Sequence, residues 1–184
     1  SGKTNIAIQA MVNAVRMGKK VAFIDPESGF SERRVGQIAG KQKESVLENT
    51  YLFEPASLKE QGRIIANLKR YNGLGLVIVD SIVYYYRLEM DKENPHPSNK
   101  ELGIQLAQLM DLARKKDLAV LITNQVYTDL NSGKVEPVGG DILKYGSKII
   151  IELSKEPRKA RLVKHQFLKS GIEREFKIVD KGVT

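Results

Sequence analysis

The run Leu76-Val77-Ile78-Val79-Asp80-Ser81 sets four apolar residues directly before two polar ones. An uninterrupted apolar run of this length is typical of a strand that is buried on both faces of a parallel sheet. The same pattern recurs at residues 21–24, which end at Asp25, and at residues 119–123, which end at Asn124-Gln125. We therefore expect three central strands of one sheet, each with a polar residue at its carboxyl end.

The segments between these strands have helical periodicity. Apolar residues recur at helical spacing in residues 5–17, in residues 57–71 and in the stretch that follows Ser98. The pairs Ser57/Glu60 and Ser98/Glu101 have the spacing of a capping box, so we expect a helix to start at each serine. Helices that alternate with buried strands indicate right-handed crossovers, with helices covering both faces of the sheet.

The last third of the chain has a different pattern. Residues 149–151, 161–165 and 175–179 look like strands with no helix between them, which predicts an antiparallel meander. Residues 86–97 and 126–140 lack periodicity and are expected to form long loops, which in compact domains are often functional. The whole pattern predicts one α/β domain, residues 1–184, with a mostly parallel sheet and an antiparallel C-terminal meander.

The composition limits the classes of function. The chain has 184 residues, a net charge of +8 and no cysteine, which excludes a disulfide scaffold, a cysteine zinc site and a thiol nucleophile. No apolar stretch approaches the roughly 18 residues of a membrane span, and no signal peptide is recognisable. We therefore expect a soluble, cytoplasmic protein without a membrane partner. The positive charge favours a polyanionic partner.

Ser1-Gly2-Lys3-Thr4 opens the first predicted helix and has the form of the second half of a phosphate-binding loop. Backbone N–H groups at a helix N-terminus bind an anion, lysine adds positive charge for the outer phosphates, and the threonine hydroxyl ligates Mg²⁺. We expect the strand and first glycine of this motif to precede Ser1, so that the chain starts inside the loop. An ordinary helix start is the alternative interpretation.

The polar residues at the strand ends extend this hypothesis. Because the carboxyl ends of parallel strands meet at one edge of a sheet, Asp25, Asp80 and Gln125 are expected to lie close together. Asp80 would hold Mg²⁺ through its water shell, beside Thr4. Glu27 could orient or deprotonate the water that attacks a γ-phosphate, and a helix N-terminal acid is an equal alternative. The Gln125 amide could contact the γ-phosphate.

Two further features favour a nucleic-acid partner. Basic residues crowd the C-terminal third of the chain: Lys144, Lys148, Lys155, Arg158, Lys159, Arg161, Lys164 and Lys169. They could neutralise nucleic-acid phosphates, with a solvated basic face as the alternative. Tyr84-Tyr85-Tyr86-Arg87, at the entrance of a predicted loop, offers rings for base stacking, with buried packing of the tyrosines as the alternative.

Four stretches, in chain order, resemble the RecA/RadA recombinase family. Residues 25–34 (DPESGFSERR) resemble its D-T-E-G-x-F-x-P-E-R segment, and residues 76–81 resemble its second nucleotide motif. Residues 122–126 resemble the strand before its second DNA-binding loop, and Gly139-Gly140 resembles the glycine pair that closes that loop. The resemblance covers essentially the whole chain.

The resemblance implies a RecA-like P-loop NTPase core that binds ATP and Mg²⁺. The chain departs from the family pattern at Pro26 and at Glu32-Arg33, which leaves Glu27 and Arg34 in register. In such a core Glu27 would activate water, Gln125 would sense the γ-phosphate and Arg34 would pack on the adenine. The implied catalytic residues are Glu27, Lys3 and Gln125. The implied cofactor-binding residues are Ser1, Gly2, Lys3, Thr4, Asn5, Arg34 and Asp80, of which Thr4 and Asp80 serve the metal.

The resemblance also implies contact with DNA. The segments 86–97 and 126–140 would face single- or double-stranded DNA, largely independently of sequence, through Arg87, Lys134 and Lys144. Within the family the likeness is to an archaeal paralogue of the main recombinase. That implies weak ATP hydrolysis, an accessory role in homologous recombination and DNA repair, and RadA-type recombinase or other recombination proteins as partners.

Two alternatives stay open at this stage. One is a strand-exchanging recombinase that forms filaments and has DNA-dependent ATPase activity. The other is a regulatory module that binds ATP as a structural ligand without turnover. Self-association into a homo-oligomer stays open as well.

Overall fold

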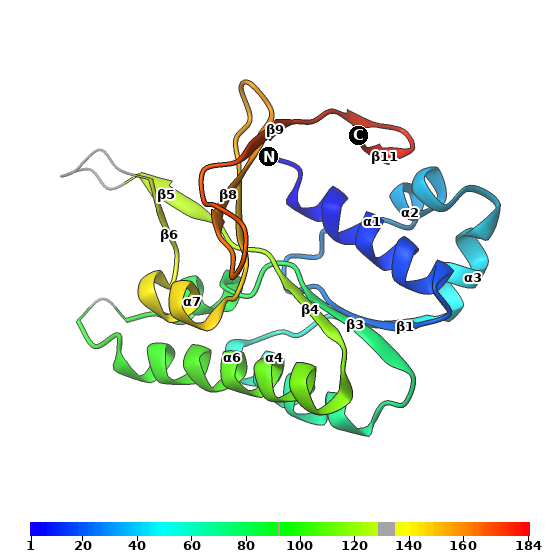
Figure 1. Ribbon diagram of the computed structural model, residues 1–184. Coiled ribbons are helices and arrows are strands. Elements are labelled where there is room, and N and C mark those ends of the chain that lie inside the picture. Colours follow the sequence, from blue (N-terminus) through cyan, green and yellow to red (C-terminus); the bar gives the residue numbers. More distant parts are fainter. Residues whose placement is uncertain (92, 129–134) are drawn as a thin grey trace.

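The computed structural model describes residues 1–91, 93–128 and 135–184, and Figure 1 shows how its elements are arranged. Its centre is a parallel sheet with the strand order β2-β1-β3-β4. The strands are β1 (Lys20–Ile24), β2 (Thr50–Phe53), β3 (Leu74–Val79) and β4 (Ala119–Ile122). The three strands predicted from apolar runs are confirmed as parallel neighbours, and β2 is an additional strand at the edge beside β1.

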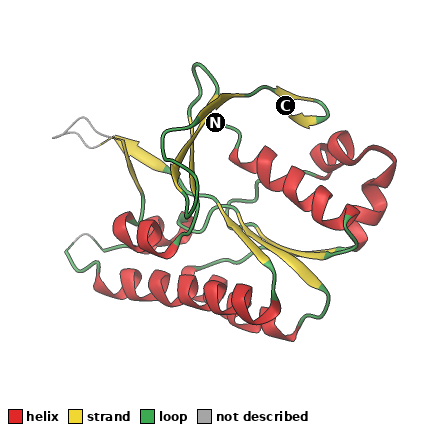
Figure 2. Ribbon diagram, viewed as in Figure 1, coloured by secondary structure: helices red, strands yellow, loops and turns green. Residues whose placement is uncertain are grey.

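Helices cover both faces of this sheet, as predicted (Figure 2). One face carries α1 (Lys3–Arg16), α2 (Glu32–Ala39) and α3 (Lys43–Glu48). The other carries α4 (Leu58–Asn67), α5 (Tyr84–Glu89), α6 (His96–Lys116) and α7 (Gly140–Gly146). Short 3₁₀ helices follow α2 and α4, at Gly40–Gln42 and Leu68–Arg70.

The residues of β3 show why helices cover both faces of the sheet. Leu76 and Ile78 join the core that contains α1, whereas Val77 and Val79 join the core that contains α4 and α6. Successive side chains of a strand point to opposite faces, so a strand with an apolar core on each side cannot alternate between apolar and polar residues. The continuous apolar run is the direct consequence.

One predicted helix start is confirmed and the other is wrong. Ser57 caps α4, where its Oγ accepts a hydrogen bond from the Glu60 backbone N–H at 3.1 Å. Ser98 is not a cap, because α6 begins two residues earlier at His96 with a proline in its first turn. Proline is tolerated there because the first N–H groups of a helix have no partner within the helix. Ser98 is buried, and its hydroxyl donates to the Glu89 carbonyl at 3.3 Å.

The C-terminal third is antiparallel, as predicted. The strands β7 (Ile150–Leu153), β8 (Lys159–Lys164) and β9 (Glu173–Glu175) form one sheet. The strands β10 (Ile178–Val179) and β11 (Gly182–Val183) form a final hairpin, residues 178–183, which we call the C-terminal hairpin.

The expectation of two long loops was wrong in part. Much of residues 86–97 belongs to α5 and to the start of α6. In the other segment, β5 (Val126–Thr128) pairs with β6 (Val135–Pro137) in an antiparallel hairpin, and α7 follows. Both segments lack the long apolar stripe of a central element, so their periodicity is weak although described parts of them form helices and strands.

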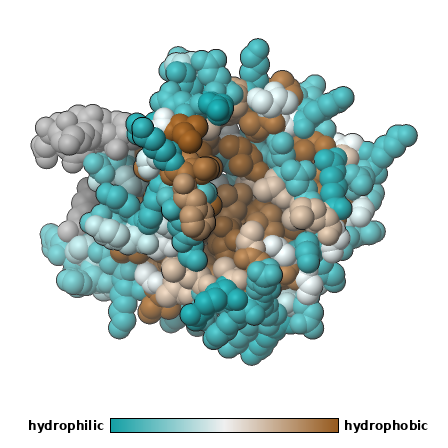
Figure 3. Space-filling view, viewed as in Figure 1, coloured by the Kyte–Doolittle hydropathy of each residue, from teal (hydrophilic) through white to brown (hydrophobic). Residues whose placement is uncertain are grey.

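The strand β4 forms an edge of the parallel sheet. Within the described residues it pairs with β3 alone, and Val120, Leu121 and Ile122 are only half-buried. Figure 3 shows hydrophobic residues gathered in the middle of this face of the molecule, between hydrophilic margins. None of the helices in the described ranges combines the length and the hydrophobicity that crossing a bilayer requires.

Candidate functional site

The N-terminus of α1 lies at the edge of the sheet where the strands end. Gly2 is the N-cap, with φ 109° and ψ 8°, and Lys3, Thr4 and Asn5 form the first turn. A short turn joins the end of α1 to β1, so helix and strand run in opposite directions, as Figure 1 shows. The unpaired N–H groups of the first turn therefore lie on the same side as the carboxyl ends of β1, β3 and β4.

Positive charge gathers at this helix end. Lys155, Lys3 and Arg158 lie close enough to Ser1 to act on it electrostatically. Two of these cations come from the segment between β7 and β8, far from the phosphate-loop motif in the sequence. A helix N-terminus surrounded by cations is suited to bind a phosphorylated ligand.

Asp80 follows β3 directly and is 6% exposed. Its Oδ1 accepts a hydrogen bond from the hydroxyl of Thr123, at the end of β4. The Asp80 backbone N–H donates to the Ile24 carbonyl at 3.0 Å, which ties the ends of β1 and β3 together. Asp80 is thus held on one side through its carboxylate and on the other through its backbone N–H.

The Thr4 hydroxyl and the Asp80 carboxylate both offer oxygen atoms, the donor type that Mg²⁺ prefers. Magnesium prefers oxygen ligands and in nucleotide sites uses one or two side chains together with phosphates and water. Among the residues that the structure describes, no group of three His, Cys, Asp or Glu side chains could hold a metal. A hydroxyl and a carboxylate are ligands of the kind that Mg²⁺ combines with phosphate oxygens and water.

Glu27 lies in the turn after β1 and makes two polar contacts through Oε1. It accepts a hydrogen bond from the Ser81 hydroxyl and another from Gln125 Nε2 at 2.9 Å. Gln125 Oε1 in turn accepts from Arg87 Nη1. Residues from three separate strand ends thus meet in one cluster, which we call the carboxyl-edge cluster: Glu27, Ser81 and Gln125. Glu27 is not a helix N-terminal acid, since α2 has Ser31 as its cap and Glu32 in its first turn.

Asp25 shapes the turn that carries Glu27. It is 1% exposed, and its carboxylate accepts hydrogen bonds from the backbone N–H groups of Gly29 at 3.0 Å and Phe30 at 2.6 Å. Ser28, inside this turn, has a φ of 53°. Asp25 therefore acts on the site indirectly, by fixing the path of residues 26–30.

Arg34 lies beside the first turn of α1. Its Nε donates to Asn5 Oδ1 at 2.7 Å, and its Nη1 donates to Gln37 Oε1 at 3.0 Å. Two further hydrogen bonds reach the C-terminal hairpin, to the carbonyls of Asp180 at 3.0 Å and Val179 at 2.8 Å. Its side chain thus joins α1, α2 and the end of the chain.

Two of the residues expected to contact DNA lie on different helices, Arg87 on α5 and Lys144 on α7. Arg87 is exposed on α5 and contacts Gln125. Lys144 is exposed on α7, where its carbonyl accepts from Lys164 Nζ at 2.8 Å. Lys134 lies outside the described residues. Of the tyrosines before Arg87, Tyr86 is a core residue whose hydroxyl donates to Asn99 Oδ1 at 2.8 Å, and burial raises its pKa.

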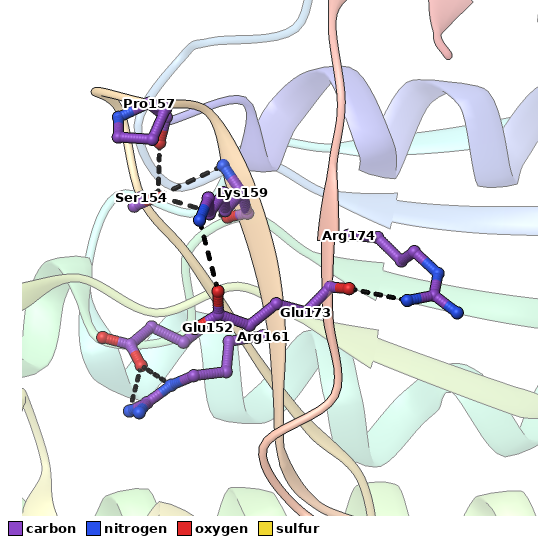
Figure 4. Close-up of polar contacts among 7 residues, drawn as sticks. All are labelled: Glu152, Ser154, Pro157, Lys159, Arg161, Glu173 and Arg174. Atoms are coloured by element: carbon purple, nitrogen blue, oxygen red, sulfur yellow. Dashed lines mark hydrogen bonds and ion pairs between the residues drawn. The ribbon is translucent and has the colours of Figure 1, made fainter.

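Part of the basic C-terminal third is paired with acids (Figure 4). Arg161 binds Glu152 through Nη2 at 2.7 Å and Nε at 3.0 Å, and Lys159 lies 3.4 Å from Glu173. Such exposed pairs contribute little stability. They do reduce the charge that β8 offers to a polyanion, so the cations near Ser1 are better placed to attract one.

Several contacts of the site were not predicted from the sequence. Ser81 and Thr123 donate to the two carboxylates, and Lys155 and Arg158 add charge at the helix end. Ser81 could have been found, because it follows Asp80 at a strand end. Thr123 follows a different strand, and Lys155 and Arg158 lie between β7 and β8, so residue type alone does not show that they reach this site.

A parallel sheet covered on both faces, with a glycine-capped helix at its carboxyl edge and an acid at the end of a neighbouring strand, defines a RecA-like P-loop NTPase core. Residues 2–184 match the family model for Rad51, and the chain belongs to the Rad51 family.

Known proteins place the chain further within this family. It is 41% identical over 186 residues to the DNA repair and recombination protein RadB of Methanococcus maripaludis strain C7, covering 99% of this chain and 86% of that protein. It is 40% identical over 193 residues to RadB of Methanosphaera stadtmanae, covering 100% and 82%. A crystal structure of the RadB recombinase superposes with a TM-score of 0.82 at 35% identity, covering 99% of this chain and 84% of that one.

Proposed function

We propose that this chain is the core of an ATP-binding, DNA-binding accessory protein of homologous recombination and DNA repair that hydrolyses ATP weakly. The observation that carries the proposal is the carboxyl-edge cluster: Glu27 and Gln125 meet at the strand ends that also hold Asp80. The names of the RadB relatives support the role in recombination. A cytoplasmic location and a RadA-type recombinase as partner belong to the same proposal.

Each site residue has a role in this proposal. The phosphates lie at the first turn of α1, with Lys3 neutralising the outer ones, and Arg34 contacts the base. Thr4 and Asp80 would hold Mg²⁺, which would supply neutralising charge for the phosphates. Glu27 orients the attacking water and Gln125 contacts the γ-phosphate. Both described hydrogen bonds of Glu27 engage Oε1, so Oε2 is the oxygen through which Glu27 would orient the water.

The DNA contact is proposed for Arg87 and Lys144. Lysine and arginine that release counterions from DNA make affinity fall steeply with salt. Replacing Lys144 by alanine should reduce the slope of log affinity against log salt by about 1. Arg114→Ala, which removes a cation already paired with Asp111 on α6, is the matched control. A slope near zero for the unmodified protein contradicts the proposal.

Lys3→Ala in the full-length protein tests the nucleotide site. Loss of a charge-assisted contact worth about 1.5–3 kcal/mol should weaken ATP binding roughly 10- to 100-fold. Titration calorimetry measures the affinity, and Lys19→Ala, at the opposite end of α1, is the control. Unchanged ATP affinity in Lys3→Ala removes the phosphate-loop assignment.

A second measurement tests turnover. Glu27→Gln should abolish ATP hydrolysis while leaving ATP binding in place, since the amide keeps the shape of the side chain but cannot accept a proton. Many-fold stimulation of hydrolysis by DNA would instead favour a strand-exchanging recombinase. ATP-dependent thermal stabilisation without turnover would favour a regulatory module.

A further inference from the structure

A pair of glutamine amides is buried between α4 and α6, which lie on the same face of the sheet (Figure 1). Gln61 on α4 and Gln105 on α6 are both 0% exposed, and Gln61 Nε2 donates to Gln105 Oε1 at 2.8 Å. The two helices approach closely here, since a Cβ on Gly62 would lie 2.5 Å from Glu101 Oε1 and 3.0 Å from Gln105 Nε2. The position of Gln61 is therefore set by the packing of one helix on the other.

Gln61 also holds the chain just beyond β3. Its Nε2 donates a second hydrogen bond, to the Ile82 carbonyl at 3.1 Å. The Ile82 N–H donates to the Thr123 carbonyl at 3.2 Å, so both polar groups of the Ile82 backbone have partners. On the other side of Ser81, Asp80 is tied to the ends of β1 and β4. Ser81 is thus fixed along the chain from both directions.

The two acceptors of the Gln61 amide decide its orientation. Both of its hydrogens are used, whereas Oε1 accepts no hydrogen bond from the residues that the structure describes. Gln105 Oε1 faces Gln61 because Gln105 Nε2 donates to the Leu58 carbonyl at 2.8 Å. Turning the Gln61 amide over would place its oxygen against two acceptors. Gln61 therefore acts here as a donor, and the backbone it serves is that of Ile82.

The far end of α5 is held independently of Gln61. The Leu58 N–H, the first of α4, donates to Glu89 Oε1 at 2.7 Å, and the Ser98 hydroxyl donates to the Glu89 carbonyl at 3.3 Å. Loss of the Gln61 contact should therefore loosen the residues between β3 and α5 without releasing the helix.

We propose that Gln61 is a positioning residue for ATP hydrolysis, because its hydrogen bond to Ile82 keeps the Ser81 hydroxyl on Glu27 Oε1. With Oε1 held by Ser81 and Gln125, Oε2 is the oxygen that would orient the attacking water. The inference rests on the proposed role of Glu27 in hydrolysis. Since Gln61 is fully buried between two helices, it acts on the site only through the backbone that carries Ser81.

Gln61→Met in the full-length protein tests this role, since it keeps the length of the side chain and removes both donors. The kcat for ATP hydrolysis should fall about 3- to 10-fold, while ATP affinity stays within about twofold. The Ile82 amide should exchange its hydrogen faster by a similar factor. An unchanged kcat overturns the inference. A parallel loss of ATP affinity overturns it as well, because a general loosening of the fold would explain both.

Gln105→Met is the matched control. It removes an equally buried amide from the facing position and leaves the hydrogen bond from Gln61 to Ile82 in place. Both variants should lower the thermal midpoint by about 3–8 °C, because each leaves a buried polar group without its partner. In Gln105→Met, however, kcat should stay within about twofold of the parent's. An equal loss of kcat in both variants would make destabilisation the cause and overturn the inference.

Combining Gln61→Met with Gln105→Met separates stability from positioning a second time. The thermal midpoint should fall by less than the sum of the two single changes, because neither amide is left without its partner. The kcat should stay as low as in Gln61→Met alone, since the Ile82 carbonyl still lacks its donor. Recovery of kcat in the combined variant contradicts the inference.

Ser81→Ala leaves α4 and α6 untouched and removes the hydroxyl itself. It should lower kcat at least as much as Gln61→Met, and a parental kcat here also overturns the inference. If Lys3→Ala keeps the parent's ATP affinity, or Glu27→Gln keeps its hydrolysis, the proposed function is wrong and this inference fails with it. If both behave as expected while Gln61→Met keeps the parent's kcat, the nucleotide site stands and Gln61 has a structural role alone.

Discussion

Replacing Asp25 by asparagine should destabilise the fold and loosen the turn that carries Glu27. The carboxylate offers one oxygen to the Gly29 N–H, at 3.0 Å, and the other to the Phe30 N–H, at 2.6 Å. An asparagine has one oxygen and one NH₂ group, so one of these backbone N–H groups would face a donor. Because the position is 1% exposed, water cannot replace the lost acceptor.

The size of the expected destabilisation follows from the charge and the burial of the Asp25 carboxylate. A hydrogen bond to a charged group contributes about 1.5–3 kcal/mol, so we expect a loss of about 2 kcal/mol. With a urea dependence of roughly 2.5 kcal/mol per molar, the unfolding midpoint should fall by about 0.8 M. Globular proteins have a total stability of about 5–15 kcal/mol, so the change is large enough to measure and small enough to leave the protein folded.

Urea unfolding followed by circular dichroism measures the midpoint, and hydrogen exchange measures the turn directly. The amide of Gly29 or of Phe30 should exchange about 10- to 100-fold faster in Asp25→Asn, in keeping with an opening eased by about 2 kcal/mol. Asp141→Asn, an exposed acid in the first turn of α7, is the control and should change the midpoint little. Equal midpoints for Asp25→Asn and the parent, together with unchanged exchange, would refute the role of this carboxylate.

Three smaller predictions concern other contacts. Thr123→Val should lower the thermal midpoint by about 4–8 °C, since it removes the hydroxyl that donates to buried Asp80, and Thr123→Ser should restore it. Ser57→Ala should cost about 1 kcal/mol in urea unfolding, because the cap of α4 is lost, whereas Ser57→Asn should keep most of it. Hydrogen bonds from Lys115 and then Arg114 hold the pKa of the Asp111 carboxyl below its ordinary value of 3.8. Any stability that this exposed carboxylate adds is therefore present above pH 3.8 and lost as the pH falls through its folded pKa, so the parent and Asp111→Asn should converge in acid and in high salt.

The central strands and the helix starts at Lys3 and Leu58 could be predicted because local sequence determines them. The apolar runs of β1 and β3 reflect burial on both faces, and Ser57 signals the start of α4. The elements β2 and α2 were missed because their local sequence gives a weaker signal. In β2, Leu52 is 42% exposed, so the strand has no continuous apolar run, and α2 is short, with only the eight residues Glu32–Ala39.

In the candidate site, too, some features could be predicted from local sequence and others could not. That Asp80 and Gln125 share an edge follows from parallel strands ending on one side of a sheet, and this needs no knowledge of contacts. The contacts of Arg34 with Val179 and Asp180 span 145 and 146 positions. No local pattern marks such a pair, since each residue type is ordinary at a surface, and only the packed chain reveals it.

The carboxyl-edge cluster also sets a condition on how this protein is prepared. Glu27 lies 54 positions from Ser81 and 98 positions from Gln125, and each residue stands at the end of a different strand. The three side chains can meet only after β1, β3 and β4 have docked in register. Helix content recovers earlier and more easily than strand register during refolding. Specific activity therefore measures the fraction of molecules whose sheet is correctly assembled. A sample whose helical circular dichroism signal has recovered can still contain many molecules with an incorrectly assembled sheet.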